Sequence, residues 1–153
     1  TTFHQGSTPH GIALVATCPK KKLFAFTERI LQPRITVCEY PHLEMKSFLD
    51  GGADVEYAAL AFDRNGVHLI SVAALPDLTL TVWVWKTQEK RVTTTLSTGP
   101  TAALSIAGAD DNLMCTQSPR MLQVWTLALT YKTWTLESTE VWLRSSLIAD
   151  SVH

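Results

Sequence analysis

The sequence predicts an all-β protein whose strands form part of a β-propeller. Segments that begin at Ile12, Tyr57 and Ala102 each read as strand, turn and strand, and their starts lie 45 residues apart. A third and a fourth short strand follow in each copy. Four strands per unit at a period in the forties are typical of a propeller blade. Apolar residues make up 46% of the chain and charged residues 18%, which indicates a globular protein.

The repeat divides the 153 residues into a lead-in, three blades and a tail. We assign residues 1–10 to the lead-in, 11–50, 51–99 and 100–137 to the blades, and 138–153 to a tail or to the start of a further blade. The first two strands of each blade are joined by "CPKKK", "DRNG" and "ADDN", which favour turns or solvated tips. The apolar spacing of the tail is also compatible with a short amphipathic helix.

The third strand of each unit carries a repeated pair of positions. "ITVCEY" begins at Ile35, "LTVWVW" at Leu80 and "LQVWTL" at Leu122. A slot repeated in register is normally a packing slot, and large side chains of one blade must pack on the next. Trp85 points to the same face as Trp83, because strand side chains alternate. The residues we predict to pack between blades are Val37, Cys38, Val82, Trp83, Trp85, Val124 and Trp125.

The fourth strands are the least periodic, and the second blade contains a long apolar run. We place the fourth strands at 45–49, 91–97 and 131–137, at an exposed edge where Thr, Lys and Arg blunt strand pairing. Residues 67–85 are long enough to span a membrane. Pro76-Asp77 at the centre of this run opposes a helix in lipid, so we predict two buried strands around a turn. Trp134 and Trp142 do not occupy the repeated pair of positions in the third strands, and one of them could be available to a partner.

The sequence contains no signature of catalysis or of a metal site. It has no GxSxG, no HExxH, no phosphate-binding glycine loop and no dinucleotide fingerprint. The three cysteines have no CxxC spacing, and Gly51-Gly52 and Asp110-Asp111 read as a connection and a turn. His68 reads as a turn or surface residue. A net charge of −1 argues against bulk nucleic-acid or membrane-surface binding, and we read Lys20-Lys21-Lys22 as a solvated turn. We therefore predict no enzyme activity, no cofactor and no metal.

The strand pairs followed by a third strand ending in "VW" resemble WD-repeat blades. The chain departs from that pattern, because a glycine-histidine dipeptide is absent before each first strand. Val84 and Thr126 stand where an aspartate follows the tryptophan, and the first copy has Cys38-Glu39. Since those groups form a hydrogen-bonded network in regular WD repeats, the resemblance implies blades held more by packing.

Longer stretches are similar to the cilia- and flagella-associated protein 43 group of WD-repeat proteins. They are "LFAFTERILQPRITVCEYPHL", "LAFDRNGVHLISVAALPDLTLTVWVWK" and "MCTQSPRMLQVWTL", within residues 11 to 127. The most specific features are the cluster Pro33, Tyr40, Pro41 and Leu43 and the stretch from Leu75-Pro76 to Trp85.

The resemblance implies a non-catalytic scaffold in the cytoskeleton of the cilium or flagellum. Such proteins belong to the axonemal tether and tether-head complex, which holds motor domains of an inner-arm dynein near the doublet microtubule. The implied partners are related WD-repeat tether proteins, inner-arm dynein heavy chains and the doublet microtubule. The alternative is a WD-repeat adaptor outside the cilium, in a ubiquitin ligase or a ribonucleoprotein assembly, because the fold alone permits either. A propeller closes with four to eight blades, so we expect the remaining blades to come from other sequence or from another chain.

Overall fold

The computed structural model describes residues 11–96, 99–101, 103–106, 112–119 and 121–142. Its strands form three antiparallel sheets of four, each a meander in which consecutive strands are neighbours. The three-unit, four-strand architecture predicted from the repeat is confirmed. The predicted lead-in, residues 1–10, lies outside the described residues.

The strand bounds follow the sequence repeat closely in the first two sheets. The first sheet contains β1 (Ile12–Cys18), β2 (Leu23–Glu28), β3 (Ile35–Glu39) and β4 (Glu44–Leu49), with a short 3-10 turn, η1 (Pro19–Lys21), after β1. The second contains β5 (Tyr57–Phe62), β6 (His68–Ala73), β7 (Thr79–Val84) and β8 (Glu89–Thr95). The third contains β9 (Ala103–Ile106), β10 (Leu113–Ser118), β11 (Met121–Thr130) and β12 (Thr133–Trp142).

The apolar run at residues 67–85 forms two strands, as the Pro-Asp break predicts. All six residues of β6 are buried, and four of the six residues of β7 are buried. β6 pairs with β7 in antiparallel register from His68–Val84 to Val72–Leu80. Within the described part of the chain, no helix has the length and apolar character that a membrane span needs.

The outer strand of the third sheet is longer than the sequence indicates. β12 continues to Trp142, although we placed the fourth strand at 131–137 and a tail or a new unit from 138. It pairs without a register break along the whole of β11, from Thr130–Thr133 to Met121–Trp142. Residues 138–142 therefore belong to the third sheet, because the unusually long β11 offers them hydrogen-bonding partners. Residues 143–153 lie outside the described residues.

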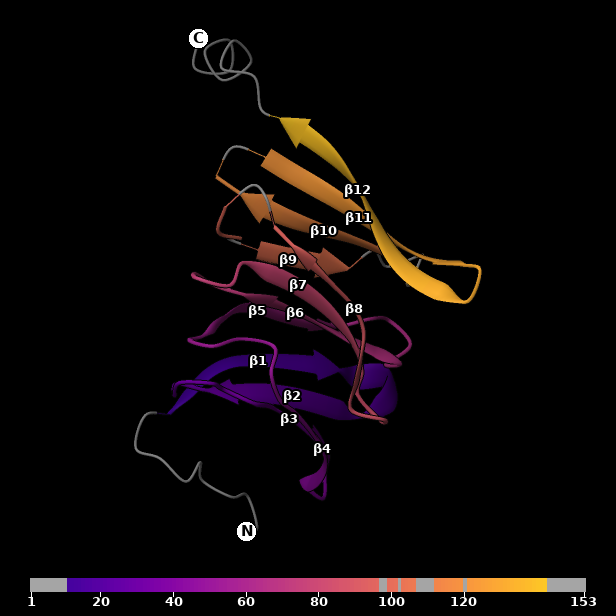
Figure 1. The fold of residues 1–153 in the computed structure, drawn as a ribbon. Helices are drawn as coiled ribbons and strands as arrows, with labels where there is room; N and C mark the ends of the chain where they lie inside the picture. The colour runs from indigo at the N-terminus through magenta and orange to yellow at the C-terminus, as the bar shows by residue number, and fades with distance from the viewer. Residues whose placement is uncertain (1–10, 97–98, 102, 107–111, 120, 143–153) are drawn as a thin grey trace, which may run out of the picture.

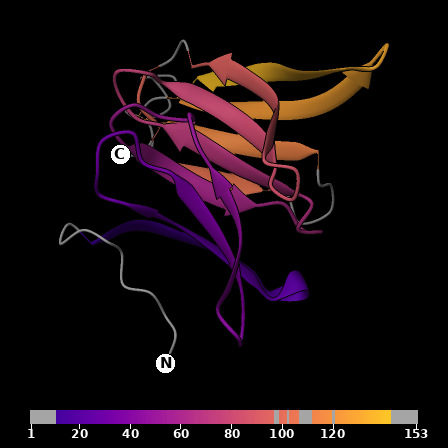
Figure 2. The same ribbon diagram turned by 60° about the horizontal axis from the view of Figure 1, so that its bottom comes forward.

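The three sheets are layered one on another in chain order (Figures 1 and 2). β1 contacts β5 and β5 contacts β9, so the first strands of the sheets lie together along one edge. β8 contacts β12 between the outer strands of the second and third sheets. Turns after first and third strands lie at one rim of this stack, and turns after second strands lie at the opposite rim, because each sheet is a meander. We call the rim that carries the turns after the first and third strands the turn rim.

Candidate functional site: inter-blade slots and strand-end contacts

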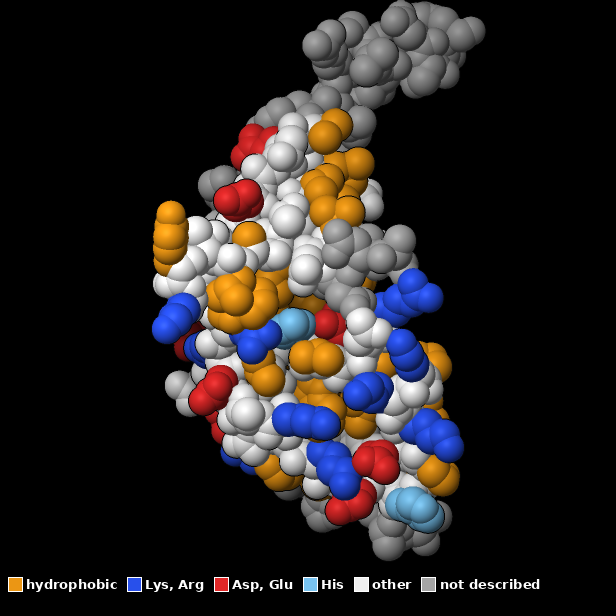
Figure 3. Space-filling model, turned by 90° about the vertical axis from the view of Figure 1, so that its right-hand side faces the viewer, with side chains coloured by type: hydrophobic (Ala, Val, Ile, Leu, Met, Phe, Trp, Pro, Cys, Tyr) orange, Lys and Arg blue, Asp and Glu red, His pale blue; other side chains and the backbone are white. Residues whose placement is uncertain are grey.

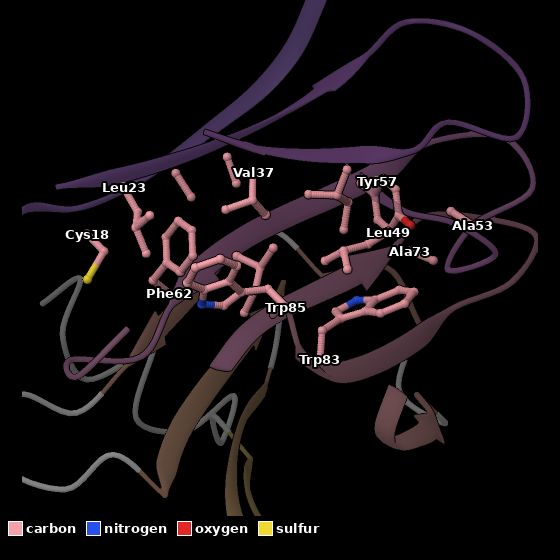
Figure 4. Packing of buried hydrophobic residues seen from close by; sticks show 14 residues of the cluster. Cys18, Leu23, Val37, Leu49, Ala53, Tyr57, Phe62, Ala73, Trp83 and Trp85 are labelled. Carbon is pink, nitrogen blue, oxygen red and sulfur yellow. The ribbon is translucent and has the colours of Figure 1, made fainter. Parts of the chain in front are cut away.

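The slot between the first and second sheets is built around two tryptophans. Trp83 and Trp85 come from the end of β7 and its following turn, and only 1% and 5% of their surfaces are exposed. They lie in one cluster with Val37 and Leu23 of the first sheet. Figure 4 shows these side chains of the first sheet projecting toward the two indoles of the second. The indoles thus fill the space between two sheets.

The slot between the second and third sheets uses the opposite face of the same strand. Val82 of β7 lies in a second cluster with Trp125 and Leu127 of β11. Trp134 of β12 packs against this cluster and is half-buried, so it is not a free surface tryptophan. The side chain of Trp142 lies outside the described part of the structure.

The repeated pair of positions in the third strands forms two columns whose side chains point in opposite directions. The valine column is Val37, Val82 and Val124, and the second column is Cys38, Trp83 and Trp125. The valine column points to the following sheet, since Val37 and Val82 each lie in the cluster shared with the next sheet. The second column points to the preceding sheet, as Trp83 and Trp125 do. Five of the seven predicted packing residues therefore lie in the two clusters.

Cys38 and Val124 belong to these columns but lie in neither cluster. Side chains alternate along a strand, so Cys38 points to the opposite face from Val37 and lies on the outer face of the first sheet. In the same way, Val124 points to the opposite face from Trp125 and lies on the outer face of the third sheet. Cys38 is paired with Phe24, whose ring centroid lies 6.3 Å from those of Phe26 and Tyr40. Only 2% of the Cys38 surface is exposed, and this burial raises the pKa of its thiol.

Hydrogen bonds within the second and third blades hold the indoles that fill both slots. The Trp83 indole donates to Ser71 Oγ at 2.9 Å, and the Trp125 indole donates to Thr116 Oγ1 at 3.0 Å. Ser71 and Thr116 occupy the same position in successive second strands. At the rim opposite the turn rim, Asp77 Oδ2 accepts from the Asp54 backbone N–H at 2.7 Å. A polar frame persists although the WD-repeat dipeptides are absent.

Glycine is required where the connection between the first two sheets crosses Trp83. A Cβ atom on Gly52 would lie 2.8 Å from Trp83 Cζ2 and would also collide with the Tyr57 hydroxyl. Gly52 is itself buried. The Gly51-Gly52 connection predicted from the sequence therefore lets the backbone approach the indole closely.

Asp63, His68 and Arg91 form a connected group that sequence reasoning missed. His68 was predicted to be a turn or surface residue, but it is buried, and its Nδ1 lies 2.8 Å from Asp63 Oδ2. Arg91 NH1 lies 2.6 Å from His68 Nε2, and the Arg91 guanidinium lies 4.2 Å from the centroid of the Trp134 ring. The available signal was the placement of an aspartate and a histidine at facing ends of β5 and β6.

The chemistry of this group is structural. An arginine can only donate, so His68 Nε2 accepts from Arg91 and the imidazole proton is on Nδ1, which donates to Asp63. With both nitrogens engaged, His68 has no free position from which to act as a base. Among the residues that the structure describes, no group of three His, Cys, Asp or Glu side chains could hold a metal ion.

Comparison with known proteins relates the chain to ciliary proteins. It is 30% identical over 129 residues to cilia- and flagella-associated protein 44 of Mus musculus. The matched region makes up 84% of this chain and 7% of that protein. It is 27% identical over 124 residues to cilia- and flagella-associated protein 43 of Xenopus laevis, covering 81% of this chain and 8% of that protein. The chain thus spans less than a tenth of these relatives. No protein-family model matches it.

Solved structures establish the fold. The chain superposes with a TM-score of 0.71 on KlHsv2 with loop 6CD replaced by a Gly-Ser linker, at 17% identity, over 87% of this chain and 46% of that one. It superposes with a TM-score of 0.68 on the β-propeller domain of Myceliophteria thermophila Cps50 (Swd1), at 10% identity, over 89% of this chain and 41% of that one. The three sheets therefore have the fold of β-propeller blades, as predicted.

Proposed function

Because this chain is a homologue of cilia- and flagella-associated proteins 43 and 44, we propose that it is a non-catalytic propeller scaffold of the cilium or flagellum. The observation that carries the proposal is the similarity to protein 44 along 84% of the chain. The structure supports a scaffold role, since the buried Ser71, Thr116, Asp63 and His68 form hydrogen bonds within their own blades and apolar clusters join the blades.

We further propose that the scaffold acts in the axoneme, where it helps to tether inner-arm dynein motor domains to the doublet microtubule and so regulates motility. Its partners would be related WD-repeat tether proteins, dynein heavy chains and the doublet itself. Support comes from the ciliary relatives and from a fold that offers rims and loops for protein contacts.

We also propose that further blades cover the outer faces of the first and third blades. Cys38 is equivalent to Trp83 and Trp125, and Val124 is equivalent to Val37 and Val82; these equivalents each contact a neighbouring blade. Val15 and Val141, which lie on these same faces, are 58% and 48% exposed. The chain covers only 46% of a solved propeller, which leaves room for such blades in a closed ring.

Endogenous tagging of the full gene product in a ciliated cell tests the ciliary role. We expect the tag along the axoneme, together with recovery of an inner-arm dynein heavy chain after cross-linking and purification. Absence of the tag from cilia would reject this role in favour of an adaptor elsewhere, such as in a ubiquitin ligase or a ribonucleoprotein assembly. Axonemal signal without cross-linking to dynein would retain the ciliary role and reject the tethering.

A further inference from the structure

Exposed cations gather on the turn rim of the first two blades. Lys20, Lys21 and Lys22 lie in and after η1, Arg64 lies in the β5–β6 turn and Lys86 lies in the β7–β8 turn. Figure 3 shows several lysine and arginine side chains over this part of the molecule, with a smaller number of aspartate and glutamate side chains among them. The whole chain has 13 basic and 14 acidic residues, so this concentration comes from their placement and not from composition.

Three of the described acidic groups near this rim are already engaged. The Asp63 carboxylate accepts from the Val67 backbone N–H at 2.9 Å and contacts His68. Glu39 and Glu44 both pair with Lys46. Among the described residues, neither Lys22 nor Lys86 has an ion-pair partner. On the described turn rim of the first two blades, Lys20, Lys21, Lys22, Arg64 and Lys86 therefore outnumber the acidic residues beside them, Asp63 and Glu89, while Asp50, Asp54, Glu56 and Asp77 lie toward the opposite rim.

A hollow of about 420 Å³ opens among these cations. Lys20 and Arg64 flank it, and its apolar lining comes from all three blades. The apolar lining residues are Cys18, Pro19, Phe62 and Ile106. A volume in this range accommodates one or two side chains of a ligand.

The walls of the hollow are held in place by contacts between the first two blades. Between the blades, Lys20 Nζ donates to Asn65 Oδ1 at 2.9 Å. Within the second blade, the Trp85 indole donates to the Gly66 carbonyl at 2.7 Å and so fixes the β5–β6 turn. A Cβ atom on Gly66 would lie 2.7 Å from Lys21 Cγ, and Gly66 has a φ of +70° that other residues rarely adopt. The two turns are thus packed against each other, and the hollow is formed before a ligand binds.

We propose that this hollow binds a short acidic polypeptide segment that carries one large apolar side chain. The apolar side chain enters between Phe62 and Ile106, and carboxylates on either side of it contact Lys20 and Arg64. Arginine suits this role because its planar fork can hold a carboxylate by two hydrogen bonds. The remaining lysines extend the attraction along the segment. This inference does not depend on the ciliary role.

A polypeptide fits the hollow better than a nucleic acid does. The cationic patch is short, and a nucleic-acid surface would need basic residues along an extended stripe. The hollow is lined by Cys18, Pro19, Phe62 and Ile106, with Thr17 and the already engaged Asp63 beside Lys20 and Arg64, whereas single-stranded nucleic acid is held on open aromatic platforms.

The test measures binding of a labelled peptide to the full chain by fluorescence anisotropy. The probe has four glutamates around one phenylalanine. Its controls have glutamine in place of the glutamates, or alanine in place of the phenylalanine. We expect the probe to bind, both controls to bind more weakly, and the affinity to fall as salt is raised. Equal binding of the glutamine control, or absence of binding, would overturn the proposal.

Variants locate the site. Lys20→Gln with Arg64→Gln should weaken binding about fivefold to tenfold, since each exposed charge pair contributes about 0.2–1 kcal/mol. Lys22→Gln with Lys86→Gln should weaken it by a smaller factor, because these residues lie outside the hollow. The matched control is Arg29→Gln with Arg34→Gln, which changes the net charge equally at the opposite rim and should leave binding unchanged. Equal weakening by the control, or displacement of the probe by a single-stranded oligonucleotide at lower concentration than by unlabelled peptide, would refute a polypeptide site here.

Discussion

At the scale of single residues, Trp83 joins packing and polar fixation in one side chain. Trp83→Phe keeps an aromatic ring in the slot but removes the donor to Ser71 Oγ and leaves a small cavity. We expect the free energy of unfolding to fall by about 2–3 kcal/mol. Urea unfolding followed by circular dichroism measures the change.

Two further variants separate the hydrogen bond from the packing. Ser71→Ala alone leaves the buried indole N–H unpaired and should cost about 1–3 kcal/mol. The double variant should cost less than the sum of the two single ones, because neither partner is then left behind. Tyr131→Phe, at a side chain that is 96% exposed, should change stability by less than about 0.5 kcal/mol. Additive single effects would mean that the hydrogen bond contributes nothing.

Tyr57 gives the chain a stability that depends on alkaline pH. Its phenol is buried in the slot between the first two blades, and burial raises its pKa. The unfolded chain ionises this phenol near a pKa of about 10, whereas the folded chain keeps it protonated. Below that pH neither state is ionised and the group has no effect. Above it the unfolded state binds fewer protons, so stability falls by up to about 1.4 kcal/mol per pH unit.

Comparison with Tyr57→Phe isolates this contribution from that of other groups. Unfolding free energies are measured for both proteins from about pH 8 to pH 11, across the ordinary tyrosine pKa. The gap between the two curves should stay constant below about pH 9.5 and then change in favour of the phenylalanine variant. Parallel curves over the whole range would show that Tyr57 titrates alike in both states.

At the scale of elements, β8 and β12 are joined across a blade boundary by Arg91 and Trp134. The Arg91 guanidinium lies over the Trp134 indole ring, and it also contacts the side chain of the buried His68. A double-mutant cycle with Arg91→Ala and Trp134→Ala should give a coupling of about 0.5–1 kcal/mol. Chemical denaturation of the four proteins provides the measurement. The same cycle on Lys86 and Trp85, whose cation–π contact lies within the second blade, is the control.

The sequence predicted elements well where a repeat constrained them. The 45-residue period located the strands of the first two blades, because hydrophobic alternation and turn residues recur in step. It did not predict the end of β12 at Trp142, since that strand is set by the length of its partner and not by its own pattern. It also missed the burial of His68, whose partners lie five residues away in the β5–β6 turn and 23 residues away on β8. A histidine in a short strand has no local signal that distinguishes a surface site from a buried one.

At the scale of the whole molecule, the two end blades differ from the central one, because each has one face that no other described blade covers. Val15 lies on the outer face of the first blade, because Ala16 and Cys18 beside it face the second. Val141 is paired with Leu122 on the outer face of the third blade. Apolar faces of this kind associate in water. We therefore expect the 153-residue chain to self-associate as its concentration rises.

Lysine substitutions test whether those two faces drive the association. Val15→Lys and Val141→Lys should each lower the mean mass in sedimentation velocity, because each places a charge where another blade surface would otherwise be buried. Val67→Lys is the matched control, since Val67 is 46% exposed, close to the 48% of Val141, but lies in a turn away from both faces. Equal dissociation by Val67→Lys would place the contact at the turn rim instead. A wild-type chain that stays monomeric and stable at high concentration would refute the need for further blades.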